Sequence, residues 1–487
     1  MSFKSLIDEI ENNIHKILDD LSVSGILFSV EPAKPGFGDV SSNVSFLLAK
    51  HLKKNPKEIA DILSEKYRQS QSTLVSKVES HPSGYLNFFA NWEKLNQLIL
   101  SESNLDEFGS VDLGKNSTIV VEHTSVNPNK ALHIGHIRNI VLGDIIARIL
   151  KKSNYKVNIL NYVDDSGLQV ADIIVGFRHF GFSQQPPQGK KFDHYCGDDV
   201  YVKTTEKYEN DPSLEEIRKN ILKELEDGNS ETAQFADKIT RRVLENQLET
   251  CWNLGVYYDC LNFESQIIRS GLWGKIFEKL KEMSLIEFEN EGKNTGCWVI
   301  RGENAEEDKV IVRSNGTATY IAKDIPYAAW KLGLLEDPFN YQKYEKIQPD
   351  NHILWQTTLV DSSEPKQNFT GKKVITVIDS RQARLQKIIT TLMSKFKSTE
   401  DAYVHLGYES VTLSADTAQT LGLNTDGKQA QMSGRKGLYV NADSVYDLLK
   451  NKIIEETTKR HPEMTDYEIK KIAHHVSVGT LRYEMIK

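Results

Sequence analysis

The feature that most constrains the fold is a strict alternation of short apolar runs and longer helical patterns, which begins near residue 117. Residues 117–124, STIVVEHT, form a continuous apolar run typical of a strand buried in a parallel sheet. Residues 133–153 then predict a helix, 155–163 a second buried strand, and 165–180 a second helix. Strand, helix, strand, helix is the beginning of a doubly wound α/β domain. The sequence therefore predicts an α/β protein built on a parallel sheet.

The pattern divides the chain into four parts. Residues 1–95 mix two helical stretches with the strand-like SGYLNFFA and predict a small N-terminal α/β domain. A catalytic domain is expected over 115–415, with a largely helical insertion at about 181–300 and a polar segment at about 335–372 that is a surface loop or a further insertion. Residues 416–440 are expected to form a loop region. Residues 441–487 predict the start of a C-terminal helical region.

Composition narrows the cellular setting and the class of partner. The net charge of −8 over 487 residues argues against a uniformly basic nucleic-acid binder but leaves room for a local basic groove. The four cysteines include no CxxC pair, which favours reduced cytosolic thiols over zinc or disulfides. The sequence contains neither a signal peptide nor an apolar run of about 18 residues, so a cytoplasmic protein without a membrane span is expected.

The stretch NPNKALHIGHIRN, residues 127–139, concentrates polar chemistry where the first strand passes into the first helix. In such sheets ligands bind beyond the carboxyl ends of the strands, and a helix start favours phosphate. His133 and His136 share one face of the turn, Gly135 allows a flat ring or ribose to approach, and Lys130 adds a positive charge. This arrangement fits a nucleoside triphosphate attacked at its α-phosphate. Two surface histidines on an amphipathic helix are the alternative, and a metal site is disfavoured because no third ligand lies nearby.

Five ordered motifs extend this interpretation to a family. HIGH resembles the first signature of class I aminoacyl-tRNA synthetases, and VEHTSVNPNKALHIGHIRNIVLGD resembles arginyl-tRNA synthetases in particular. So do ILNYVDDSGLQVA, RSNGTATYIAKDIPYA and MSGRKG. The segments GDVSSNVSFLLAKHLKKNPKEIA and GYLNF are similar to the extra N-terminal domain of that family, which contacts the tRNA elbow. The resemblance implies a Rossmann-like catalytic domain.

The resemblance also implies an arginine site. A guanidinium requires carboxylates placed for paired hydrogen bonds, and the family motifs assign this role to Glu122 and Asp324. Asn127 and Gln382 would hold the α-amino and carboxylate end of arginine, and Tyr320 would line the same pocket. Taken singly, Glu122 could instead be a surface strand end, and Asp324 a helix cap or a solvated residue.

The second signature departs from the class I pattern. Where that class carries Lys-Met-Ser-Lys-Ser, this chain has QMSGRKG at 431–437, with Gly434 in place of the second lysine. The resemblance implies that Lys130 substitutes for the missing charge. The expected catalytic residues are therefore Lys130, His133 and His136. The expected ATP contacts are His133, Gly135, His136, Met432, Ser433 and Lys436. An ordinary surface turn is the alternative for the loop.

These features together predict ligation of L-arginine to tRNA(Arg) through arginyl-adenylate. ATP is expected as cosubstrate with accompanying Mg²⁺, without a dedicated protein metal site. The alternatives are another class I synthetase or adenylyltransferase, and a non-catalytic tRNA-binding paralogue. A monomer is expected.

The sequence ends about one helix into the region where the family continues with an anticodon-binding domain, so most of that domain is expected to be missing. The apolar side of the last helix is then expected to be partly exposed, with packing onto the catalytic domain as the alternative.

Overall fold

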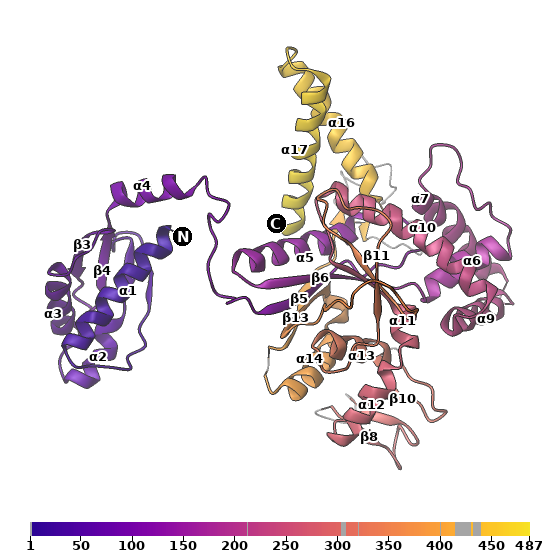
Figure 1. Cartoon of the computed structure of the whole chain (residues 1–487), viewed down its shortest axis with the longest axis horizontal. Helices are drawn as coiled ribbons and strands as arrows, with labels where there is room; N and C mark the ends of the chain where they lie inside the picture. Colours follow the sequence, from indigo (N-terminus) through magenta and orange to yellow (C-terminus); the bar gives the residue numbers. More distant parts are fainter. Residues whose placement is uncertain are drawn as a thin grey trace. The chain divides into compact units, whose positions relative to one another are not determined.

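The computed structural model describes residues 2–211, 213–302, 308–319, 321–399, 401–413, 430–431 and 440–487. These residues form two units. The first comprises Met1–Leu113 with Lys152–Asn154, and the second comprises Gly114–Lys151 with Tyr155–Lys487 (Figure 1).

The N-terminal unit packs helices on an antiparallel sheet. Its strands β1 (Val30–Pro32), β2 (Val40–Ser42), β3 (Val75–Ser80) and β4 (Leu86–Ala90) lie in the order β1-β2-β4-β3. Apolar residues at helical spacing bury one side of α1 (Ser2–Asp20), and the core also takes side chains from α2 (Val44–Leu52), α3 (Pro56–Arg68) and α4 (Trp92–Glu102). Asn55 caps α3 by accepting a hydrogen bond from the amide of Lys57, and Pro56 follows at the first helical position.

The second unit is built on a seven-stranded sheet in the order β11-β12-β7-β6-β5-β13-β14. Every neighbouring pair is parallel except β11 and β12, which are antiparallel. The strands are β5 (Thr118–Glu122), β6 (Lys156–Val163), β7 (Cys260–Phe263), β11 (Asn340–Lys343), β12 (Trp355–Thr358), β13 (Lys373–Asp379) and β14 (Tyr403–Tyr408). From β5 the chain adds β6 and then β7 on one side of β5, and it later returns to add β13 on the other side. The carboxyl ends of β5 and β13 therefore flank the switch point at which ligands bind in such sheets.

Two sequence expectations differ from this sheet. Residues 181–300, expected to be a helical insertion, contain the four-residue β7, which lies between β6 and β12. Residues 335–372, expected to be a surface loop or a further insertion, contain the strands β11 and β12 of the main sheet. The strand β10 (Lys309–Val312) lies outside this sheet: it pairs with β9 (Trp298–Ile300), which also pairs with β8 (Glu287–Phe288), in a separate antiparallel sheet. Strands this short carry too few residues for a period of two to stand out.

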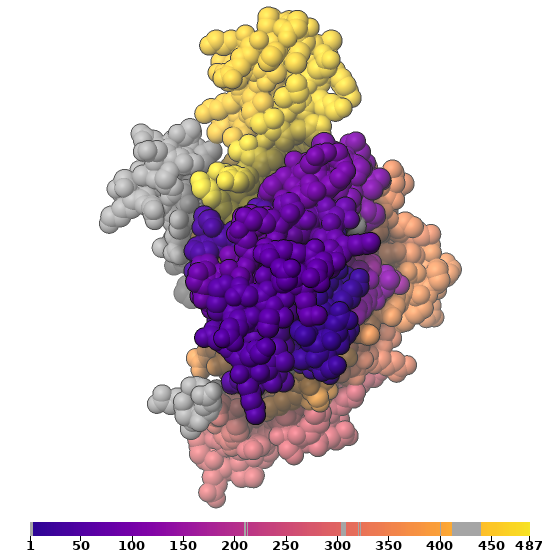
Figure 2. Space-filling model, turned by 90° about the vertical axis from the view of Figure 1, so that its left-hand side faces the viewer, coloured from indigo at the N-terminus to yellow at the C-terminus, as the bar shows by residue number. Residues whose placement is uncertain are grey.

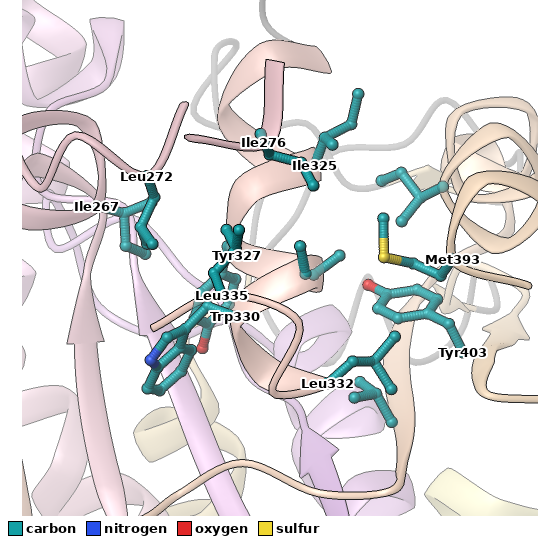
Figure 3. Packing of buried hydrophobic residues seen from close by; sticks show 14 of the residues in the cluster. Ile267, Leu272, Ile276, Ile325, Tyr327, Trp330, Leu332, Leu335, Met393 and Tyr403 are labelled. Carbon is teal, nitrogen blue, oxygen red and sulfur yellow. The ribbon is translucent and has the colours of Figure 1, made fainter. Parts of the chain in front are cut away.

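Helices cover the sheet on both faces, as the doubly wound pattern predicts (Figure 1). Figure 3 shows the packing of one core, where Tyr327 and Trp330 of α13 lie among apolar residues and Met393 of α14 lies beside Tyr403 of β14. The helices of this unit before residue 400 are α5 (Ile134–Lys152), α6 (Leu168–Arg178), α7 (Phe192–Tyr195), α8 (Val202–Asn210), α9 (Leu214–Asp227), α10 (Glu231–Asn253), α11 (Glu264–Arg269), α12 (Leu272–Glu282), α13 (Ile321–Lys331) and α14 (Ala383–Lys397). No helix among the described residues is long and apolar enough to cross a membrane.

The last two helices, α16 (Ala442–Arg460) and α17 (Asp466–Ile486), form a hairpin that projects from the sheet domain (Figures 1 and 2). The apolar side of α17, expected to be partly exposed, is buried at its carboxyl-terminal end. Leu481 and Met485 are buried in the core beside α5, and Arg482 pairs with the buried Asp144 of that helix. Val476, on the apolar side that was expected to be partly exposed, is exposed. The carboxyl-terminal part of α17 therefore packs onto the catalytic domain, as the alternative has it, while part of its apolar side is exposed.

Candidate active site

The turn between β5 and α5 holds two histidines face to face. The rings of His133 and His136 stack with centroids 3.5 Å apart and planes inclined by 16°. The His133 amide donates to Nδ1 of His136 (3.2 Å), and the His136 amide donates to Nδ1 of His133 (3.3 Å). Because both Nδ1 atoms accept, each neutral ring carries its proton on Nε2. The Cβ that Gly135 lacks would stand 3.1 Å from the His133 ring, so this glycine makes room for the histidine.

The positive charge of this turn resides on Lys130 and not on the histidines. Burial and the charge of Lys130 lower the pKa of His133 to about 4. Burial, His133 and Lys130 also lower the pKa of His136 well below its usual value. Both rings are therefore neutral near pH 7 and act as N–H donors. Lys130 is itself almost fully buried, with its ammonium 5.5 Å from the centre of the Tyr201 ring.

The start of α5 is less open than the sequence predicts. The Ile134 amide donates to the carbonyl of Val440 (3.0 Å), and the His136 amide donates to the carbonyl of His133 (2.8 Å). Ala442 in turn donates to the carbonyl of Leu132 (2.9 Å). The helix therefore keeps its positive dipole end, but two amides expected to be available for phosphate already have partners. These bonds also join the HIGH turn to the segment that follows residue 439.

A cavity of about 370 Å³ opens beside this turn, at the switch point of the sheet. Among the described residues that line it are four with carboxylates, Glu122, Asp164, Glu264 and Asp324, and two lysines. Gln382, in the short turn between β13 and α14, lines the same cavity. A site with this excess of negative charge suits a ligand with more than one positive charge.

Glu122 at the end of β5 is buried and already paired. The ammonium of the buried Lys331 on α13 pairs with its Oε2 and also approaches Thr376 (3.4 Å) and Tyr403 (3.5 Å). The Ser125 hydroxyl donates to Glu122 Oε1 at 3.2 Å. Burial by itself would lower the pKa of Lys331, but Glu122 and Tyr403, through their charges and hydrogen bonds, together outweigh burial and leave that pKa raised. Glu122 is therefore not a surface strand end.

Asp324 and Asp164 are two carboxyl groups of the cavity whose pKa values are raised. Among the described residues, Asp324 has neither a hydrogen-bond partner nor an ion-pair partner. Burial, reinforced by the carboxylates of Glu264 and Glu122, raises the pKa of Asp324 to about 7. Burial and Glu264 also raise the pKa of Asp164 well above its usual value, and the Oδ1 atom of Asp164 is buried without a hydrogen-bond partner. A cation that binds in the cavity would stabilise the charged forms of these two carboxyl groups and lower their pKa values.

The structure brings together three of the residues expected to bind arginine, because Glu122, Asp324 and Gln382 line one cavity. Asn127 stands next to it and donates to the main-chain carbonyl of Asp164 at 3.4 Å. The other expected contacts lie outside the described residues: Tyr320, Met432, Ser433 and Lys436.

Comparison with known proteins places this geometry in a family. Residues 95–337 match the family described as tRNA synthetases class I (R), catalytic domain, and residues 4–90 match the arginyl tRNA synthetase N terminal domain. The chain is 33% identical over 95% of its length to an arginine–tRNA ligase of Thermococcus sibiricus, of which it covers 72%. The chain belongs to the arginyl-tRNA synthetase family. A second arginine–tRNA ligase, from Pyrococcus furiosus, is 32% identical to this chain. The match spans 99% of this chain and 76% of the length of that relative.

A solved structure of the family has the same architecture. The arginyl-tRNA synthetase of Thermus thermophilus superposes with a TM-score of 0.78 at 30% identity, over 99% of this chain and 75% of that one. Members of this class I family use ATP. The doubly wound sheet and the HIGH turn described above are therefore the frame of an arginyl-tRNA synthetase catalytic domain.

The segment after the second signature is anchored by a charged cluster. Asp443 accepts hydrogen bonds from Lys191 (2.7 Å), His194 (3.0 Å) and Thr250 (2.8 Å). Although burial opposes it, the bonds from His194 and Lys191 lower the pKa of Asp443. Asp193, His194 and Asp443 are the one group among the described residues whose donor atoms could share a metal ion. The Lys191 ammonium already neutralises that group, which favours a structural role.

Sequence reasoning missed four residues that the structure adds to the site. Lys331 pairs with Glu122, Asp164 and Glu264 line the cavity, and the charge of Arg381 contributes to the lowered pKa of His133. Asp164 ends β6 in YVDD, and a polar residue at the end of a buried parallel strand is a usable signal. Lys331 offered no such signal, because its partner is 209 residues away.

Proposed function

We propose that this chain activates L-arginine with ATP and transfers it to tRNA(Arg). The observation that carries the proposal is the acidic cavity at the sheet's switch point, next to the HIGH turn. An extended amino acid with two positive charges would neutralise Asp324 and Asp164 together. Its guanidinium can donate two parallel hydrogen bonds to a carboxylate. Family membership supports the same substrate.

In the first step, Glu122 and Asp324 would bind the guanidinium, while Asn127 and Gln382 would hold the amino acid backbone. An oxygen of the arginine carboxylate attacks the α-phosphorus of ATP, the bond to the bridging oxygen breaks, and pyrophosphate leaves. The Nε2–H groups of His133 and His136, with the ammonium of Lys130, would stabilise the charge that moves onto the leaving phosphates. Mg²⁺ would accompany ATP as its counter-ion.

In the second step, a ribose hydroxyl of the terminal adenosine of tRNA attacks the arginyl carbonyl. The new ester bond forms as AMP leaves with the electrons of the mixed anhydride. The same cavity holds the arginyl side chain through both steps, so specificity is exerted twice with one set of carboxylates. We also propose that the N-terminal unit contacts the tRNA elbow, that Met432, Ser433 and Lys436 close over ATP, and that the enzyme works as a cytoplasmic monomer.

The deciding experiment is ATP–pyrophosphate exchange with each of the twenty amino acids, with and without tRNA(Arg). We expect exchange with arginine alone, and stronger exchange with tRNA present. Exchange with a different amino acid would point to another class I specificity. Binding of tRNA without any exchange would point to a non-catalytic paralogue.

A further inference from the structure

The backbone that leads from β5 to the HIGH turn adopts an unusual conformation. The Ser125 amide donates to the carbonyl of His123 (3.1 Å) and closes a three-residue turn, here called the Thr124 turn. The φ of Thr124 at its centre is +78°, and that of Ser125 is +47°. Thr124 is the one β-branched residue among the described non-glycine residues with a positive φ, and a γ-turn of this hand is rare and strained. Such a conformation persists only where neighbouring groups hold it in place.

Three buried side chains hold the Thr124 turn. The Oδ1 atom of Asn139 accepts a hydrogen bond from the Thr124 amide (2.5 Å), and Oδ1 of Asn161 accepts one from the Ser125 amide (3.3 Å). The hydroxyls of Tyr258 and Thr124 share a hydrogen bond of 2.7 Å. Because Asn139, Asn161 and Tyr258 are all buried, a bond that is lost here is not readily replaced by one to water.

Asn139 also connects the Thr124 turn to the other side of the switch point. It lies on α5, three residues after His136 of the HIGH turn. Its Nδ2 group donates to the carbonyl of Val377 on β13 (2.7 Å) and to the hydroxyl of Tyr408 on β14 (3.2 Å). One amide side chain therefore joins the turn after β5, the first turns of α5 and the strand β13.

The Thr124 turn orients groups that surround the arginine cavity. Ser125 lines the cavity beside Glu122, and its hydroxyl donates back to Glu122 Oε1 at 3.2 Å. Asn127, two residues further along, donates to the carbonyl of Asp164 at 3.4 Å. If Thr124 and Ser125 relaxed to negative φ, the chain would leave β5 in another direction, and Ser125 and Asn127 would lose these positions.

We propose that Asn139 is a positioning residue for arginine. It holds the Thr124 turn in its left-handed conformation and thereby keeps Glu122, Ser125 and Asn127 in the geometry that binds arginine. The inference rests on the proposed function, because it requires arginine to occupy this cavity. Asn139 is not among the described residues that line the cavity, so it acts through the turn and not by touching the substrate.

The test measures the KM for arginine and the KM for ATP in ATP–pyrophosphate exchange with tRNA(Arg) present. Asn139→Ala is studied in the parent chain and together with Thr124→Gly, because glycine adopts a positive φ without the steric cost of a Cβ. The matched control is Asn158→Ala on β6. Asn158 also donates to a main-chain carbonyl, that of Thr370 (3.2 Å), but it lies toward the amino end of its strand. Thermal melting verifies that each variant is folded.

We expect Asn139→Ala to raise the KM for arginine about tenfold, because the buried Thr124 amide loses its acceptor and the turn relaxes. The KM for ATP should change little. With Thr124→Gly in place, the same substitution should raise the KM for arginine much less, because the turn is then no longer held against strain. A hydrogen bond that stabilised only the fold would give the same loss in both backgrounds. Asn158→Ala should behave like the parent chain.

The proposal is overturned by an unchanged KM for arginine in Asn139→Ala, by parallel rises in the KM for arginine and the KM for ATP, or by an equal loss in the two backgrounds. If Asn139→Ala alone does not fold, the double variant must fold and use arginine, and its failure to do so also overturns the proposal. A failure of the proposed function itself is separately visible, because the parent chain would then show no exchange with arginine.

Discussion

At the scale of single residues, arginine recognition depends most on Asp324, whose carboxylate has no partner among the described residues. We predict that Asp324→Asn weakens the use of arginine by about 2–5 kcal/mol, the cost of removing one partner from a buried hydrogen-bonded charge pair. The KM for ATP should change little. Steady-state exchange kinetics would measure both, and unchanged kinetics for arginine would exclude Asp324 from the site.

The raised pKa of Asp324 makes arginine binding depend on pH. With a pKa of about 7, this carboxyl is half protonated at pH 7 in the empty cavity. Arginine favours the charged form, so binding should release a proton below pH 7 and release almost none at pH 8 or above. Affinity should therefore fall by up to about tenfold per pH unit below 7. Calorimetry in two buffers of different ionisation enthalpy would count the protons, and Asp324→Asn should remove this contribution.

Lys130 carries the positive charge of the HIGH turn, because its two histidines are neutral. We predict that Lys130→Ala lowers the rate of activation by about 10²–10³, the effect of losing one transition-state donor. Lys436→Ala should lower it less. Exchange rates at saturating arginine and ATP would compare the two. A larger effect at Lys436 would mean that the signature loop supplies the charge.

At the scale of elements, helix α5 requires glycine at position 143, although glycine is unfavourable inside a helix. A Cβ at Gly143 would stand 2.2–2.5 Å from the buried His123 ring. Gly143→Ala should therefore destabilise the catalytic unit by about 1–3 kcal/mol through overpacking. Gly479 in α17 is the control, since an added Cβ there meets nothing within 4 Å. Gly479→Ala should stabilise by about 0.5–1 kcal/mol. Thermal melting of both variants would test these opposite signs, and equal shifts would contradict the packing argument.

At the scale of the whole molecule, the N-terminal unit has a core of its own. The buried residues of that core all lie between Leu6 and Leu95. Hydrogen bonds from Val111 and Leu113 to the carbonyls of Lys152 and Ser153 come later in the chain. We predict that residues 1–105 fold alone with one cooperative thermal transition, since a domain with its own core can do so. Circular dichroism would follow the transition, and a broad, non-cooperative melt would contradict it.

The sequence by itself determined the frame of this protein. Strands β5 and β6 and helices α5 and α6 were predictable, because continuous apolar runs and helical spacing reflect burial directly. The order of the motifs identified the family, and with it Glu122, Asp324 and Gln382, which line one cavity in the structure.

Only the tertiary structure decided the rest. Strands β7, β11 and β12 are four residues long, and strands that short are stabilised by their neighbours and not by an intrinsic pattern. The pairing of Glu122 with Lys331 joins residues 209 apart. The docking of Arg482 on Asp144 joins residues 338 apart. Such partners are chosen by the packing of the sheet and its helices, because proximity in space, and not spacing along the chain, decides which buried charges meet.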